Sequence, residues 1–222
     1  GRAIYLNMDL SQFDAERKFH SPTERAIRGI VLALLADVGV EPACRVSFES
    51  GTAPHVEMTR HHVGDLTVLG LLREYDEGAD DEIATVYLPE PVYAYNMRQH
   101  KALGRVSEIT APMEPGQVAV FCLSPRELGG PSVSVAAGEA DPGDTVLYEA
   151  AGGAGDVAEA IHVTVLRPDG TQAEDYTQNL IAGGDAAAGT IPLALDDPQG
   201  TWRIVFRSVL SGLTAEAAFE VR

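Results

Sequence analysis

The chain has 222 residues, of which 45% are hydrophobic and 22% are charged, and its formal net charge is −17. The apolar fraction is typical of a globular protein and excludes a wholly disordered chain, while the length allows one large domain or two small ones. The acidic excess argues against nucleic acid and anionic membranes as partners, because both are bound through basic surfaces.

Two further features bear on origin and compartment. The chain begins with Gly1 rather than methionine and shows no signal segment, so we expect a piece of a longer bacterial protein. Cys44 and Cys122 are too few for a disulfide framework or a zinc site, and we expect both to be small buried residues. The protein is expected to be soluble; the compartment stays open, with the cytoplasm favoured.

Residues 1–43 are predicted to form one strand followed by one helix. The apolar run Ala3–Leu6 is typical of a strand. Ser21 and Glu24 have the spacing of a capping box at a helix start, and Gly39 is a typical helix stop. Between them, apolar side chains recur on one helical face: Ile27, Ile30, Val31, Leu34, Leu35 and Val38.

Residues 44–128 are predicted to form a first antiparallel β-sandwich. Turn signals at Asp76–Asp81, Pro89–Pro91 and Glu114–Gly116 separate short apolar runs. The predicted strands are Val56–Met58, Leu66–Leu72, Ile83–Leu88, Val92–Tyr95, Val106–Ile109 and Val118–Leu123.

Residues 131–222 follow the breaker Gly129–Pro131 and are predicted to form an immunoglobulin-like sandwich, with Trp202 in its core. Its motifs Pro142–Val146 and Val165–Gly170 resemble patterns of macroglobulin-type domains. Residues 1–130 hold 12 basic and 19 acidic residues, a net charge of −7. Residues 131–222 hold 4 basic and 14 acidic residues, a net charge of −10. This uneven distribution of charge favours two domains. The seven predicted strands are Val133–Ala136, Thr145–Glu149, Ile161–Leu166, Gln172–Thr177, Gly189–Leu195, Thr201–Ser208 and Ala215–Val221. The fold class is therefore mainly β, with two antiparallel β-sandwich domains and one N-terminal helix.

Three motifs of the first β region carry a family resemblance: Val92–Arg98, Lys101–Arg105 and Met113–Phe121. Together they resemble the β-rich C-terminal region of beta-galactosidase-like glycoside hydrolases of family 42 and their uncharacterised relatives. Asn96 stands where that pattern commonly has aspartate. Gly1–Val40 resembles the end of the amidotransferase-like trimerisation domain that precedes this region.

The resemblance implies a parent enzyme whose catalytic carboxylates belong to an upstream barrel, so no catalytic residue is assigned in this chain. We expect a non-catalytic accessory fragment of a multidomain, carbohydrate-active protein, without a cofactor. Its expected partner is the rest of the parent chain. Because an unpaired strand exposes edge groups, the strand Ala3–Leu6 is expected either to pack on the first sandwich or to pair with a second copy.

An enzyme in its own right is a third, less favoured hypothesis. A retaining glycosidase needs two carboxylates about 5 Å apart, one of them in an apolar setting. The candidates are Glu49, Glu57, Glu74 and Glu108, for which solvent-facing strand positions are the simpler explanation.

A calcium-binding module is one form of the alternative function. Asp76, Asp80 and Asp81 lie in a dense acidic loop, which lacks the spacing of an EF-hand and is more typical of a solvated hairpin. The pair His61 and His62 is adjacent in a strand, so the two rings point to opposite faces and are not expected to share a metal.

A polysaccharide-binding module is the other form of that alternative. Tyr87, Tyr93, Tyr95 and Trp202 are the candidates for a platform on which sugars stack, although core positions are favoured for them. Gly152–Gly155 is rich in glycine but opens no helix and has no lysine after it, so it is not a phosphate loop.

Overall fold

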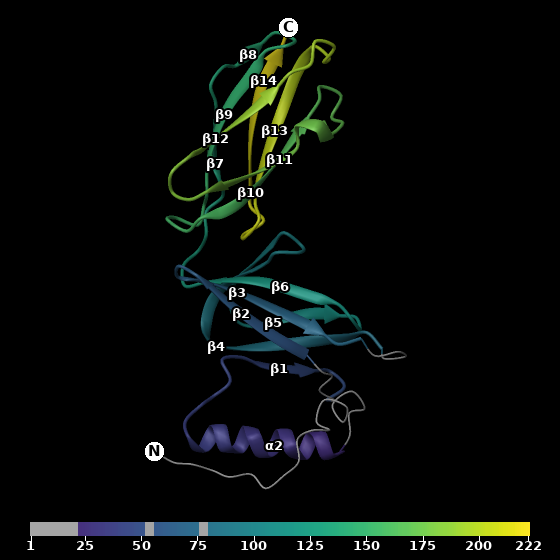
Figure 1. Cartoon of the computed structure of the whole chain (residues 1–222), viewed down its shortest axis with the longest axis vertical. Helices are drawn as coiled ribbons and strands as arrows, with labels where there is room; N and C mark the ends of the chain where they lie inside the picture. The colour runs from purple at the N-terminus through teal and green to yellow at the C-terminus, as the bar shows by residue number, and fades with distance from the viewer. Residues whose placement is uncertain (1–21, 52–55, 76–79) are drawn as a thin grey trace. The chain divides into compact units, whose positions relative to one another are not determined.

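The computed structural model describes residues 22–51, 56–75 and 80–222, and the fold is mainly β (Figure 1). The chain divides into two compact units, residues 1–43 and 44–222. In the described part, no helix has the length and apolar character needed to cross a membrane. The predicted strand Ala3–Leu6 and the cap residue Ser21 lie outside the described residues. The predicted boundary at 128–131 stays a prediction.

Helix α2, Pro22–Asp37, confirms the helix expected in the N-terminal unit. Gly39 ends it with a φ of +77°, a conformation that glycine adopts without strain. The Gly39 N–H donates to Ala36 O at 3.0 Å, and the Val40 N–H donates to Leu35 O at 2.8 Å. These bonds satisfy carbonyls that the end of the helix would otherwise leave free.

The first part of the second unit is one antiparallel sheet in the order β1-β4-β6-β3-β2, with β5 also on β4. Strand β5 pairs along almost the whole of β4, so β1 and β6 share the opposite edge of β4, one after the other. The strands are β1 Arg45–Phe48, β2 Val56–Val63, β3 Leu66–Arg73, β4 Glu82–Asn96, β5 Lys101–Met113 and β6 Val118–Ser124.

The predicted turn at Pro89–Pro91 is wrong, because β4 continues through it. The register with β5 shifts between Tyr87 and Val92, where the ladder is interrupted. Proline cannot donate to a ladder, but its fixed φ suits an extended strand. The two prolines therefore interrupt pairing and let β4 change its neighbour from β1 to β6, without ending the strand.

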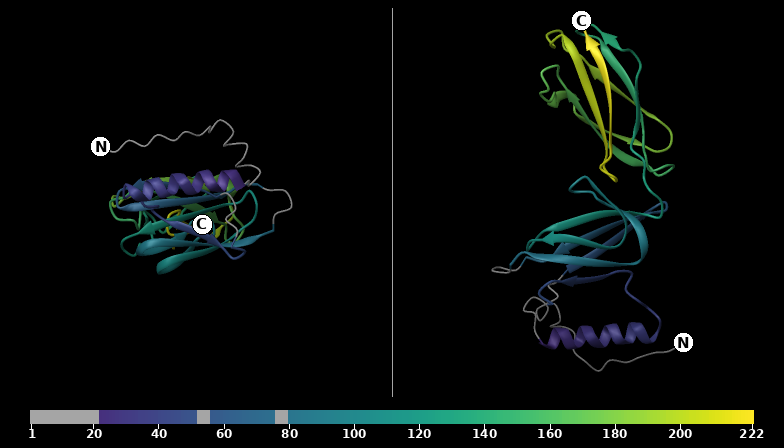
Figure 2. Two further views of the ribbon diagram at one scale, coloured as in Figure 1. Left: turned by 90° about the horizontal axis from the view of Figure 1, so that it is seen from below. Right: turned by 180° about the vertical axis from the view of Figure 1, so that it is seen from behind.

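The second part is a sandwich of two sheets, β11-β10-β13-β14-β8 and β12-β9-β7. Strand β7 pairs with β9, and β8 then pairs in parallel with β14, so the chain crosses from one sheet to the other (Figures 1 and 2). This arrangement bears out the predicted β-sandwich. The strands are β7 Ser132–Val135, β8 Glu139–Ala140, β9 Thr145–Ala151, β10 Glu159–Leu166, β11 Gln178–Ala182, β12 Ala187–Pro192, β13 Gly200–Ser208 and β14 Thr214–Val221.

The strand predicted at Gln172–Thr177 is also wrong. This segment contains the 3-10 helix η1, Glu174–Tyr176, and the strand follows it as β11. The ring of Tyr176 packs against that of Trp202, with centroids 6.0 Å apart. The Tyr176 O–H donates to Asp197 Oδ2 at 2.6 Å. Contacts with a distant part of the chain thus favour a turn over a strand here.

Tyr148 of β9 lies across Gly189 of β12, its directly paired neighbour. A Cβ on Gly189 would stand 2.2 Å from Tyr148 Cζ, so only glycine leaves room for the ring. Tyr148 is 1% exposed, and among the described residues its hydroxyl has no hydrogen-bond partner. Burial raises the pKa of Tyr148 to about 12.

We expect Tyr148→Phe to raise the free energy of unfolding by about 1 kcal/mol, because it removes a buried hydroxyl that lacks a partner. Tyr95→Phe is the matched control: the Tyr95 hydroxyl accepts from the Leu128 N–H at 2.7 Å, so its loss should cost about 1 kcal/mol. Urea unfolding followed by circular dichroism measures both. Equal destabilisation by the two variants would contradict the prediction.

Candidate functional site

Trp202, a candidate for a sugar-stacking platform, lies in the core of the second sandwich. It is fully buried, and its Nε1–H donates to Pro198 O at 2.9 Å. Phe219 stacks on the ring at 6.1 Å between centroids, and Tyr176 lies on it at 6.0 Å. The ring faces are therefore occupied by the protein itself.

The tyrosine candidates do not form one surface. Tyr95 is 3% exposed and Tyr93 is half-buried, whereas Tyr87 is 44% exposed. Tyr87 lies on the first half of β4 and accepts a hydrogen bond from Ser47 Oγ at 3.3 Å. The structure thus brings Tyr93 and Tyr95 together on the second half of β4 and keeps Tyr87 and Trp202 apart from them.

The four carboxylate candidates lie on or directly after four different strands. Glu57 is on β2 and Glu108 on β5, while Glu49 and Glu74 follow β1 and β3. Three of the four are exposed, and Glu74 is half-buried. An apolar setting of the kind that holds a catalytic carboxyl protonated does not surround the three exposed groups.

The acidic loop shows a structural role for one of its aspartates. Asp76 lies outside the described residues, while Asp80 and Asp81 are exposed. The backbone carbonyl of Asp80 accepts from Arg73 Nη2 at 2.9 Å, and Arg73 Nη1 also donates to Met113 O at 2.5 Å. Within the ranges that the structure describes, no group of three or more His, Cys, Asp or Glu side chains is placed to hold a metal.

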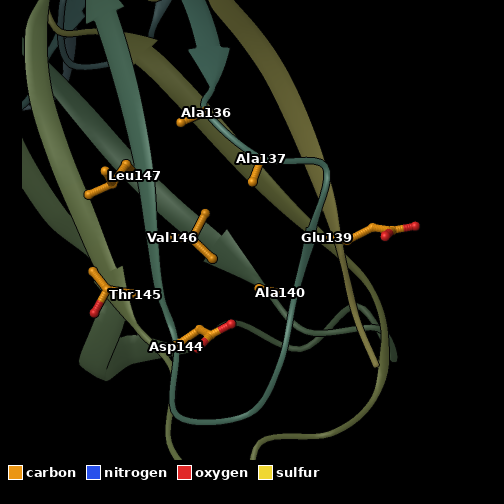
Figure 3. Close-up of a pocket in the computed structure, with 8 residues that line it drawn as sticks. All are labelled: Ala136, Ala137, Glu139, Ala140, Asp144, Thr145, Val146 and Leu147. Atoms are coloured by element: carbon orange, nitrogen blue, oxygen red, sulfur yellow. The ribbon is translucent and has the colours of Figure 1, made fainter.

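A pocket of about 240 Å³ lies where the chain crosses from β7 to β8, beside β9. Figure 3 shows Glu139 at its rim, pointing away from β9. Glu139 pairs with Arg222, and the Asp144 carboxylate accepts the Asp141 N–H at 2.9 Å. The pocket's remaining lining is mainly apolar: Ala136, Ala137, Ala140, Thr145, Val146 and Leu147.

The most extensively built site joins the first sheet to the second sandwich. We call its apolar part the junction cluster. Strands β3, β4 and β6 supply one buried side chain each, and the connecting segment and the loop after β9 supply two more. These five are Leu66, Tyr95, Cys122, Leu128 and Ala154, against which Tyr93, Met97, Val157 and Leu210 pack.

Backbone contacts hold the connecting segment against the glycine-rich stretch Gly152–Gly155, which we call the docking loop. The Gly129 N–H donates to Gly153 O at 3.1 Å. A Cβ on Gly153 would stand 2.0 Å from Gly129 O, so the two backbones meet at a distance that only glycine allows. Arg126 Nη2 donates to Ala154 O at 2.6 Å and so holds the loop from the side of the first sheet.

A buried carboxylate supports the docking loop from within the second sandwich. Glu159, which is 3% exposed, accepts the Ala154 N–H on Oε1 at 3.0 Å. The Ser208 hydroxyl donates to Glu159 Oε2, and Ser208 Oγ accepts the Ser211 N–H at 3.1 Å. A chain of hydrogen bonds therefore runs from Arg126 through the docking loop to the turn between β13 and β14.

Both cysteines are buried and free, as expected. Burial, with smaller contributions from Glu159 and Asp65, raises the pKa of Cys122 to about 12. Burial also raises the pKa of Cys44. The thiolate is the reactive form, so both side chains are placed as inert packing residues.

Sequence reasoning missed the docking loop. The signal was present in Gly152–Gly155, where three glycines occur in four positions without the lysine of a phosphate loop. Such a run also marks a close approach of two backbones. The segment that it meets, around Gly129, was predicted only as a breaker between domains.

No protein-family model and no curated protein match the chain. One similar solved structure is titled a polysaccharide lyase, with 12% identity and a TM-score of 0.30, covering 76% of this chain and 26% of that one. Another is the glycoside hydrolase domain of Endo-D from Streptococcus pneumoniae, with 8% identity and a TM-score of 0.30. That match covers 80% of this chain and 37% of the other. The chain thus spans about a quarter and about a third of these two proteins, and the resemblance to family 42 stays a prediction.

Proposed function

We propose that this chain is a non-catalytic architectural module, which holds its first sheet and its second sandwich in a fixed relation as part of a larger protein. The interlocked junction carries this proposal. A flexible linker would leave the segment around Gly129 solvated, whereas here it is bonded to Gly153 and its Leu128 N–H is bonded to Tyr95. The sequence motifs in 92–121 are the reason to expect a carbohydrate-active parent, and the rest of that parent is the proposed partner.

Three buried polar side chains support a structural role, because they bond to the backbone. Arg73 satisfies two carbonyls, Glu159 satisfies the docking loop, and Asn96 Oδ1 accepts the Gln99 N–H at 3.0 Å. A catalytic group must instead reach a substrate. These side chains are already engaged with the protein.

Spin-label distances across the junction test the proposal. Labels at Glu108→Cys and Glu216→Cys, two exposed positions on β5 and β14, leave the buried Cys44 and Cys122 unlabelled. Double electron–electron resonance on the full chain should give one narrow distance distribution. A broad distribution in this labelled protein would overturn the proposal.

Gly153→Ala is expected to broaden that distribution, because the new Cβ would meet the backbone oxygen of Gly129, which cannot move aside as a flexible side chain would. Gly138→Ala is the matched control, since a Cβ there has no atom within 4 Å. Both variants should keep the circular dichroism spectrum of the unsubstituted protein. An unchanged distribution in Gly153→Ala would show that the docking loop does not set the geometry.

A further inference from the structure

A row of polar side chains crosses the outer face of the larger sheet next to the junction. Asn179 of β11, His162 of β10 and Arg207 of β13 are directly paired neighbours in the ladder. Paired residues in an antiparallel sheet point to the same face, so the three side chains lie side by side. His162 Nδ1 lies 2.8 Å from Asn179 Oδ1; the amide oxygen only accepts, so Nδ1 is the donor.

The turn between β4 and β5 brings a second imidazole to this row. His100 lies in that turn with a φ of +52°. A Cβ on Gly212, in the turn after β13, would stand 2.5 Å from His100 C, so the two turns touch. Burial lowers the pKa of His100, and the nearby Arg207 and His162 lower it further, which places the three groups within electrostatic range.

Arg207 carries a buried donor, Nε, that has no hydrogen-bond partner in the part of the chain that the structure describes. The residue as a whole is half-buried. A buried donor without a hydrogen bond costs about 1–3 kcal/mol of stability, and more when the group is charged. Neither His100 nor His162 carries an acidic group that could compensate the charge of Arg207.

We propose that a small oxyanion binds at this place, with the guanidinium of Arg207 as its main ligand and His100 and His162 beside it. The Nε–H and an adjacent Nη–H of arginine form a planar fork that matches two oxygens of phosphate, sulfate or a carboxylate. An anion there would supply the missing acceptor and a charge opposite to that of the guanidinium. The site needs both sides of the junction, so the proposal rests on the proposed function.

Phosphate is the probe for the first test. Titration of the ¹⁵N-labelled full chain with sodium phosphate, at constant ionic strength set with sodium chloride, should give saturable shifts of the His100, His162 and Gly212 signals. Sulfate and acetate arms then distinguish tetrahedral oxyanions from carboxylates as the bound class. If none of the three anions gives saturable shifts, the proposal is overturned.

Arg207→Gln should weaken binding about tenfold to a hundredfold, because it removes charge-assisted hydrogen bonds. Arg203→Gln is the matched control: Arg203 lies on the same face of β13, is 50% exposed and is paired with Glu216. Arg207→Lys keeps the charge without the fork and should bind with an intermediate affinity. Equal affinity in Arg207→Gln, or equal weakening in Arg203→Gln, would overturn the assignment.

The two proposals fail separately. A narrow spin-label distance without saturable anion shifts would remove only the anion site. A broad distance would remove the architectural role and with it the basis of the site. An NMR spectrum of Arg207→Gln with the same signal dispersion as the unsubstituted protein shows that the variant is folded. Its loss of anion binding is then a local effect.

Discussion

Trp202→Ala is expected to lower the free energy of unfolding by about 3–5 kcal/mol. The side chain is fully buried between Phe219 and Tyr176, so its removal leaves a cavity and also deprives the carbonyl of Pro198 of its donor. Because Trp202 is the only tryptophan in the chain, unfolding in urea should be followed by circular dichroism rather than by intrinsic fluorescence.

Two variants control this measurement. Trp202→Phe keeps an aromatic ring in the core and should cost less than Trp202→Ala. Tyr87→Ala, at a position that is 44% exposed, should change stability by about 0.5 kcal/mol or less. A Trp202→Ala protein that keeps its stability and loses binding to a polysaccharide in calorimetry would instead support the sugar-stacking hypothesis.

Glu159→Ala is expected to cost about 2–5 kcal/mol and to loosen the docking loop. The substitution leaves the Ala154 N–H and the Ser208 hydroxyl without their buried acceptor, and each such loss costs about 1–3 kcal/mol. Urea unfolding gives the free energy. Hydrogen exchange at the Ala154 amide reports the loosening of the docking loop. This amide should exchange much faster in the variant than in the unsubstituted protein.

Glu159→Gln separates the hydrogen bonds from the charge. Its amide oxygen can still accept from Ala154, so it should cost less than Glu159→Ala. Glu149→Ala, at an exposed position of β9, should be close to neutral. If Glu159→Ala is no more destabilising than Glu149→Ala, the buried carboxylate is not what supports the loop.

Local signals in the sequence predicted much of the fold. The stop at Gly39 and the helical spacing of apolar residues identified α2. Alternation in Ile161–Leu166 and Thr201–Ser208 identified β10 and β13, whose inward side chains are buried. These predictions succeeded because each depends on neighbours within a few residues of one another.

The two wrong predictions of secondary structure have a common cause. The two prolines near residue 90 are strong local signals for a turn, yet the ladders on either side of them keep β4 extended. The acidic run at Glu174–Tyr176 was predicted as part of a strand, yet Tyr176 is held over Trp202 as a turn. In both cases long-range contacts outweighed the local preference.

The sequence by itself determined the class of this protein: an acidic, mainly β chain with one helix and a β-sandwich. Only the tertiary structure decided which residues form a site. Arg126 bonds to a residue 28 positions away, Tyr95 to one 33 away and Glu159 to one 49 away. A junction built from such pairs leaves no periodic pattern in the sequence, because its residues become neighbours only after the sheets have formed.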